Sequence, residues 1–226
     1  MFASAERENQ RVVAHRWETN RVEAFSDGVF AIAITLLVLE IHLDPKDFEH
    51  LLRALVDEWP AYFAYVTSFL TVGSVWIAHH NLYTHLRYVD GVLLRLNMLL
   101  LLVAAFLPFP TAVMAQAFEH SQTAERVAVA FYGGTALLIE LLLRSAITYA
   151  VSKPELTDTT PPGAPPPKPE RNWREAVTAS LYGLAILAGI FIFPKLAAAA
   201  YLLVAIRGVL VVGGEGRLSL RRLSRR

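Results

Sequence analysis

Six apolar runs, each long enough to cross a lipid bilayer, constrain this chain more than any other feature of its sequence. The hydrocarbon core of a bilayer is roughly 30 Å thick, and an α-helix needs about 20 apolar residues to cross it. The runs lie at 22–41, 59–79, 92–115, 124–143, 173–193 and 196–212. With 54% hydrophobic and 18% charged residues, the chain is too apolar for an ordinary soluble domain. The sequence therefore predicts an all-α integral membrane protein with six transmembrane helices.

Polar segments between the runs divide the chain into five parts. We predict an N-terminal tail over 1–21, membrane helices one to four within 22–150, a linker over 151–172, membrane helices five and six within 173–212, and a basic tail over 213–226. Seven of the 12 prolines lie in the linker, between Pro154 and Pro169. Proline-rich segments are extended and solvated, so we expect this linker to bury nothing. An alternative is that it binds a proline-reading protein module.

Positive charges are distributed unevenly between the two sides of the predicted bundle. Most of the 21 lysines and arginines lie in the two tails, in the loop after the second run and in the Pro-rich linker. Because lysine and arginine accumulate in cytoplasmic loops, both termini are predicted to be cytoplasmic. The loop over 42–58, on the opposite side, has five acidic residues against two basic ones. It should modestly concentrate cations there.

One short motif resembles an ion filter without having the context of one. Residues 71–76 read TVGSVW, like the start of a potassium-selective carbonyl filter, which needs extended backbone that lines water. These residues lie inside a continuous apolar run, where non-helical backbone would lack hydrogen-bond partners. We therefore expect a helix-packing patch of small residues around Gly73 and Ser74.

The pattern of ionisable residues inside the predicted helices favours structural roles over metal binding or catalysis. His79 and His80 are adjacent and suggest metal or haem ligation, but neighbouring residues on a helix point about 100° apart. We favour interfacial or hydrogen-bonded histidines instead. Glu140 and Arg144 are four residues apart, so they are expected to neutralise each other on one helix face.

The residue inventory also limits the chemistry. Cysteine is absent, which excludes disulfides and thiolate metal sites. No grouping of serine, histidine and carboxylate residues has the context that catalysis requires. We predict no enzyme activity, no cofactor, no structural metal and no nucleic-acid partner.

The stretch Phe25–Ile41 of the first run has two faces when it is drawn as a helix at about 100° per residue. Ile32, Thr35, Leu36 and Leu39 fall within one stripe about 100° wide, whereas Asp27 falls about 130° from its centre. The only hydroxyl of this region after Ser26 thus shares a face with leucines. The carboxylate does not.

Asp27 needs a partner, because a carboxylate within a membrane helix is costly. Candidate donors from the same and neighbouring helices are Arg21, Trp76, His79, His80 and Asn97. One hypothesis is that Ser26 and Asp27 form a packed polar network that fixes the first helix to its neighbours. The alternative is a helix-start cap, in which both residues only satisfy free backbone amides.

These residues also carry a resemblance. The spacing RxxxFSD, formed by Arg21, Phe25, Ser26 and Asp27, is similar to a signature of the transmembrane-protein-175 family of cation channels. The following AIAITLLVLEI resembles the bacterial members of the family. Two further elements match on the second and third runs: Trp76, His79 and His80, and the segment RLNMLLLLVAAFLPFPT.

The resemblance implies a potassium-selective, leak-type channel in the plasma membrane of a bacterium. It implies a homotetramer embedded in lipid, whose pore is lined by the first helix of each subunit and narrowed by apolar side chains without a carbonyl filter. By offset from Asp27, the constriction falls on Ile32, with Leu36 and Leu39 as further rings. The layer of hydroxyl groups that contributes to selectivity falls on Thr35. The permeant ion is K⁺.

Other functions stay open at the level of the residues themselves. A secondary transporter would use broken helices and ionisable groups at mid-membrane, and a non-conducting scaffold would pass no ions. Without a pore, the stripe would be an ordinary packing face, with Thr35 bonded to the carbonyl four residues back.

Overall fold

The computed structural model describes residues 17–43, 45–157, 173–191 and 193–223. In it, helices cover each of the six segments that the sequence predicts to cross a membrane. The long helices are α2 (Thr19–Leu36), α4 (Trp59–Tyr83), α5 (Gly91–Phe106), α6 (Pro108–Ala117), α7 (Gln122–Val151), α8 (Trp173–Phe191) and α9 (Pro194–Leu223). Shorter elements are η1 (Leu37–Glu40), η2 (Pro45–His50), α3 (Leu51–Asp57) and η3 (Pro154–Leu156).

Four segments of the described chain are long and apolar enough to cross a membrane. They are Thr19–Glu40, Trp59–Tyr83, Gly91–Ala117 and Gln122–Val151. The all-helical, membrane-spanning character predicted from the sequence is thereby confirmed. The described part of α8 contains a shorter apolar stretch, Ser180–Gly189, so the fifth and sixth crossings stay predictions.

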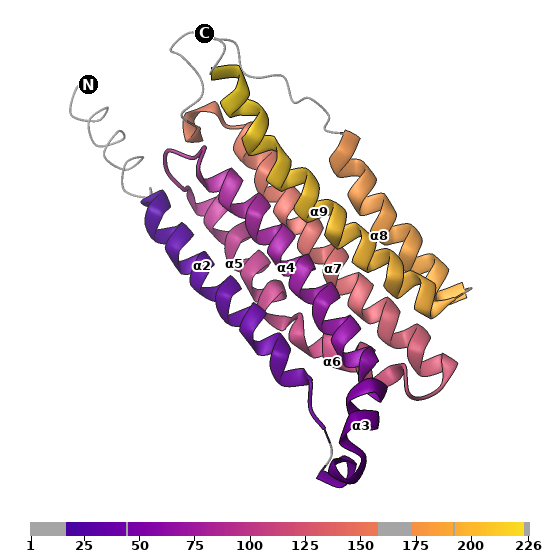
Figure 1. Cartoon of the computed structure of the whole chain (residues 1–226). Helices are drawn as coiled ribbons and strands as arrows, with labels where there is room; N and C mark the ends of the chain where they lie inside the picture. The colour runs from indigo at the N-terminus through magenta and orange to yellow at the C-terminus, as the bar shows by residue number, and fades with distance from the viewer. Residues whose placement is uncertain (1–16, 44, 158–172, 192, 224–226) are drawn as a thin grey trace, which may run out of the picture.

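The helices form a bundle in which α2 occupies one edge (Figure 1). α2 packs against α4 and α5, α5 packs against α7, and α9 fills the space between α4 and α8. The start of α2 and the end of α9 lie at the same end of the bundle (Figure 1). Among the described residues, this edge position leaves one side of α2 without a neighbouring helix (Figure 1).

Side-chain caps determine where two of the long helices begin. The Asp90 carboxylate accepts hydrogen bonds from the backbone amides of Val92 (3.1 Å) and Leu93 (2.8 Å) at the start of α5. Ser121 Oγ accepts one from the Ala124 amide (3.3 Å) at the start of α7. Each cap satisfies amides that have no partner inside the helix.

Several helix boundaries differ from the predicted runs. The run at 92–115 is divided at Leu107, because Pro108 and Pro110 have no N–H to continue the helical hydrogen bonds. α7 continues to Val151, past the predicted end at 143, since Ala146 and Ala150 bury their side chains there. α9 continues to Leu223, so most of the predicted tail over 213–226 is helical.

The expectation that the Pro-rich linker buries nothing is wrong for its first residues. Leu156 in η3 is only 2% exposed and belongs to a cluster with Tyr83, Leu86 and Val89. The Arg87 amide donates to the Leu156 carbonyl oxygen (2.8 Å). The buried leucine and the backbone contacts beside it attach the first residues of the linker to the bundle. Residues 158–172 of the linker lie outside the described residues.

The polar residues predicted to serve packing do so. Residues 71–76 are helical within α4, and a Cβ at Gly208 of α9 would lie 2.9 Å from Ser74 Cβ. The small-residue contact is therefore confirmed at Ser74, although Gly73 has no close neighbour. Arg144 Nε donates to Glu140 Oε1 (3.1 Å), which confirms the predicted pair.

We expect Gly133→Ala to destabilise the bundle. A Cβ at this position would overlap the hydroxyl of Tyr201 and lie 2.7 Å from Ile186 Cγ1. The Tyr201 ring is fully buried and its hydroxyl donates to the Val129 carbonyl oxygen (3.1 Å), so it has little room to move. Overpacking of this kind costs about 1–3 kcal/mol, measurable as a lower unfolding temperature in detergent.

The matched control is Gly134→Ala. A Cβ there would have no neighbouring atom within 4 Å, and alanine favours helix over glycine. Its unfolding temperature should equal that of the parent or exceed it. Equal unfolding temperatures for the two variants would contradict the tight contact between α7 and α9.

Candidate functional site

A chain of buried hydrogen bonds joins α2 to α4 and α5. Asn97 Nδ2 on α5 donates to Ser26 Oγ on α2 (3.0 Å), and Ser26 donates to the Val22 carbonyl oxygen (2.8 Å). His79 Nε2 on α4 lies 2.9 Å from Asn97 Oδ1. Since a carbonyl oxygen can only accept, Nε2 carries the proton in this arrangement. Three helices thus share one polar chain in a region where unpaired polar groups are costly.

His79 is held on both faces by aromatic rings. Its ring stacks on Tyr83 at a centroid distance of 4.2 Å and meets Phe30 edge-on at 5.3 Å. The side chain is 1% exposed, which suits a hydrogen-bonded packing histidine. In the described part of the chain, no three histidine, cysteine or carboxylate side chains are placed to hold a metal ion.

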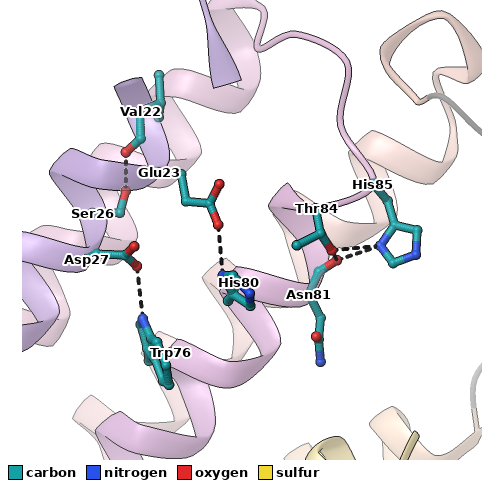
Figure 2. A network of polar contacts seen from close by, with 9 residues as sticks. All are labelled: Val22, Glu23, Ser26, Asp27, Trp76, His80, Asn81, Thr84 and His85. Atoms are coloured by element: carbon teal, nitrogen blue, oxygen red, sulfur yellow. Dashed lines mark hydrogen bonds and ion pairs between the residues drawn. The ribbon is translucent and has the colours of Figure 1, made fainter. Parts of the chain in front are cut away.

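Two further contacts join α2 to α4 nearer the bundle surface (Figure 2). Trp76 Nε1 donates to Asp27 Oδ1 (2.9 Å), and His80 Nδ1 lies 2.8 Å from Glu23 Oε1. Glu23 and Asp27 are one turn apart on α2, and Trp76 and His80 are one turn apart on α4. The two antiparallel helices therefore pair in register over a full turn.

The helix-start interpretation of Ser26 and Asp27 is wrong. α2 begins at Thr19 with Glu18 as its N-cap residue, so both side chains lie about two turns inside the helix. Amides at that depth are already paired within the helix. The contacts to Asn97 and Trp76 are the kind that the alternative, a network fixing α2 to its neighbours, requires.

Not every residue of the predicted network takes part in it. Arg21 and Phe25 are exposed, away from the contacts that Ser26 and Asp27 make. Glu23 does take part, through His80, and the sequence reasoning missed it. Its position four residues before Asp27 is the signal that would have pointed to it, because that spacing puts both carboxylates on the same face.

Past Arg21, the opposite face of α2 and of η1, which continues it, is apolar and exposed in the described part of the chain. Ile32 is 62% exposed and Leu39 is 69% exposed, whereas Phe30 and Leu37 on the packed face are at most 1% exposed. We call Ile32, Thr35, Leu36 and Leu39 the α2 stripe; all four are exposed. Thr35 Oγ1 donates to the Ile32 carbonyl oxygen (2.9 Å), three residues back instead of four.

Comparison with known proteins places these helices in a family. The family described as endosomal/lysosomal potassium channel TMEM175 matches residues 21–108, which include α2, α4 and α5. A potassium channel of Chamaesiphon minutus is 40% identical over 142 residues, covering 62% of this chain and 69% of that relative. The chain belongs to the TMEM175 family.

Two other matches support the family. A potassium channel of Streptomyces collinus is 48% identical over 116 residues, or 51% of this chain; the match spans only 56% of that relative's length. The crystal structure of a lysosomal potassium-selective channel TMEM175 homolog from Chamaesiphon minutus superposes with a TM-score of 0.73 at 34% identity. It covers 86% of this chain and 97% of that structure.

We expect Asn97→Ala to destabilise the packing of α2 against α4 and α5. The substitution leaves His79 Nε2 and Ser26 Oγ without their partner, and a buried unpaired polar group costs about 1–3 kcal/mol. Thermal unfolding in detergent, followed by size-exclusion chromatography, measures the loss.

Asn81→Ala is the matched control for this substitution. Asn81 is exposed, and its side chain points away from the contacts of its neighbours (Figure 2). Exposed substitutions usually change stability by less than about 0.5 kcal/mol. A loss of the same size in both variants would show that the chain through Asn97 contributes nothing specific.

Proposed function

We propose that this protein is a potassium channel in which four copies place α2 around a shared axis, with the α2 stripe lining the ion path. The observation that carries the proposal is the bare apolar face of α2, directed away from the protomer's own core. A membrane helix turns such a face toward lipid or toward another protein surface. The names of the bacterial relatives, both called potassium channels, favour the second.

The constriction in this proposal is a ring of Ile32 side chains, followed by rings of Leu36 and Leu39. Apolar side chains cannot replace the water around an ion, so a tight ring dewets and resists flow. A slightly wider ring passes a partly hydrated cation. The proposed pore uses no carbonyl filter; the TVGSVW segment, which resembles the start of one, is helical within α4.

Thr35 supplies the polar layer between these rings. Its hydroxyl proton is used by the Ile32 carbonyl oxygen, so the lone pairs of Oγ1 remain available to a cation. K⁺ holds its water less tightly than Na⁺, and it should therefore exchange water for hydroxyl oxygen more readily. Selectivity by such a layer is modest.

The membrane arrangement follows the charges. We place both termini in the cytoplasm of a bacterial cell and the η2 and α3 segment outside the plasma membrane, in agreement with the lysine and arginine distribution. The contacts between copies lie on the edge helix α2, and the helices farther from the axis face lipid. The channel needs no cofactor beyond its permeant K⁺.

Flux measurements on purified protein in liposomes separate this proposal from its alternatives. A potassium gradient should drive passive, electrogenic flux through a channel. Saturable uptake coupled to a second ion would indicate a secondary transporter, and absence of flux would indicate a non-conducting scaffold.

We expect Ile32→Ala to raise potassium flux several-fold, because it widens the narrowest ring and makes it easier to wet. Single-channel conductance or liposome flux measures the change. Leu203→Ala on α9, equally exposed in the protomer at 67% but far from α2 in the bundle, is the control. Parental flux from the Ile32 variant would remove this residue from the constriction.

Thr35→Ala should reduce the preference for K⁺ over Na⁺ without changing assembly. The substitution removes the only side-chain oxygen of the α2 stripe, whereas Thr35→Ser keeps it and should retain the preference. Reversal potentials with K⁺ on one side and Na⁺ on the other measure the ratio. An unchanged reversal potential in the alanine variant would contradict a selectivity role.

A further inference from the structure

The segment between α2 and α4 carries an apolar face that nothing in the described part of the protomer covers. Five large side chains are exposed at a spacing of three and four residues: Phe48, Leu51, Leu52, Leu55 and Val56. Leu52 is 80% exposed and Val56 is 65% exposed. Helix α3 has no buried residue at all. We call these five residues the outer apolar face; the four in α3 lie on one side of that helix by their spacing, and Phe48 precedes them in η2.

The other side of the same segment is charged. Arg53 Nε lies 3.5 Å from Asp57 Oδ2, one turn along α3, with both side chains mostly exposed. Such a pair contributes little to stability in water, but it marks the side that faces solvent. The segment is therefore amphipathic, with a solvated charged side and an apolar side that needs a partner.

The outer apolar face lies beyond the hydrocarbon region. Thr19–Glu40 comprises 22 residues, which reach about 33 Å at 1.5 Å per residue and so already cross the bilayer core. Figure 1 places η2 and α3 past the end of the bundle, below α6. Trp59, at the start of α4, stacks on Phe118 (centroid distance 6.2 Å) and anchors the segment to that end.

Charge argues against a lipid surface as the partner. Amphipathic helices that lie on membranes carry lysine and arginine on their polar side, which attract anionic lipids. Here acidic residues outnumber basic ones between Pro45 and Trp59. Another copy of the same segment fits better, because it brings an equally exposed apolar face to the same level, outside the hydrocarbon region.

Continuity along the chain points to the same partner. The exposed face of α2 continues through Val38 and Leu39 of η1, both at least 50% exposed, and leads into η2 and α3. An open hollow of about 580 Å³ between η2 and α3, lined in part by His50, Leu51 and Leu52, has room for a side chain from a neighbour. A surface that surrounds a shared axis along α2 and η1 would therefore lead toward this segment.

We propose that the outer apolar faces of neighbouring copies pack against one another and form a collar around the outer ends of the α2 helices. This inference rests on the proposed assembly around α2. The collar buries apolar surface that would otherwise contact water. It also turns the charged side of each segment, in which acidic residues outnumber basic ones, toward the solvent above the ion path. Cations would be concentrated there.

Site-directed spin labelling tests the collar, because the chain has no native cysteine. A nitroxide at Leu52→Cys, in liposomes, should be immobile, coupled to labels on other copies, and protected from both oxygen and a water-soluble nickel chelate. The matched control, Arg53→Cys on the charged side, should be several-fold more accessible to nickel. High oxygen accessibility at Leu52 would indicate lipid, and high nickel accessibility would indicate water; either overturns the collar.

Two more variants complete the test. One probes the collar without a spin label, and the other measures assembly around α2 separately from the collar. Oxidation of Val56→Cys should give disulfide-linked dimers on denaturing gels, and absence of dimers would contradict the collar. A label at Leu39→Cys reports assembly around α2 alone. Coupling at Leu39 without coupling at Leu52 would overturn the collar and leave the proposed pore intact. Absence of coupling at both positions would overturn the two together.

Discussion

The hydrogen-bond chain from His79 through Asn97 to Ser26 is the constraint on which the arrangement of this bundle depends. Inside a bilayer, a polar group without a partner is costly, so these three side chains can pair in few ways. Their pairing sets the rotation of α2 about its own axis. Because a helix is rigid and turns about 100° per residue, fixing Ser26 also fixes where Ile32 and Leu36 point.

The polar contacts and the bare stripe are two consequences of that one rotation. Glu23 and Asp27 meet His80 and Trp76 on the packed side of α2. This leaves the other side, from Phe25 onward, apolar except for Thr35. The match to the TMEM175 family over residues 21–108 covers the three helices that make these contacts. The proposed ion path and the proposed collar both use the surface that the contacts leave free.

The remaining helices support this arrangement from behind. α9 lies against α4, with Gly208 close to Ser74, and Tyr201 fits against Gly133 of α7. Buried hydroxyls add to the same packing: Ser68 Oγ lies 2.7 Å from Thr111 Oγ1 and 3.2 Å from the Tyr132 hydroxyl. A well-packed support of this kind lets α4 act as a fixed wall on which α2 is positioned.

The sequence by itself determined the helices, their apolar character and the separation of Asp27 from the α2 stripe, since these follow from composition and from the periodicity of a single helix. Only the tertiary structure decided that Asp27 pairs with Trp76 among five candidates, that Glu23 pairs with His80, and that Leu156 of the linker is buried. It also extended α7 beyond its apolar run, where Ala146 and Ala150 are buried. Such features depend on how two helices are rotated and shifted against each other, and the periodicity of either one alone carries no information about that.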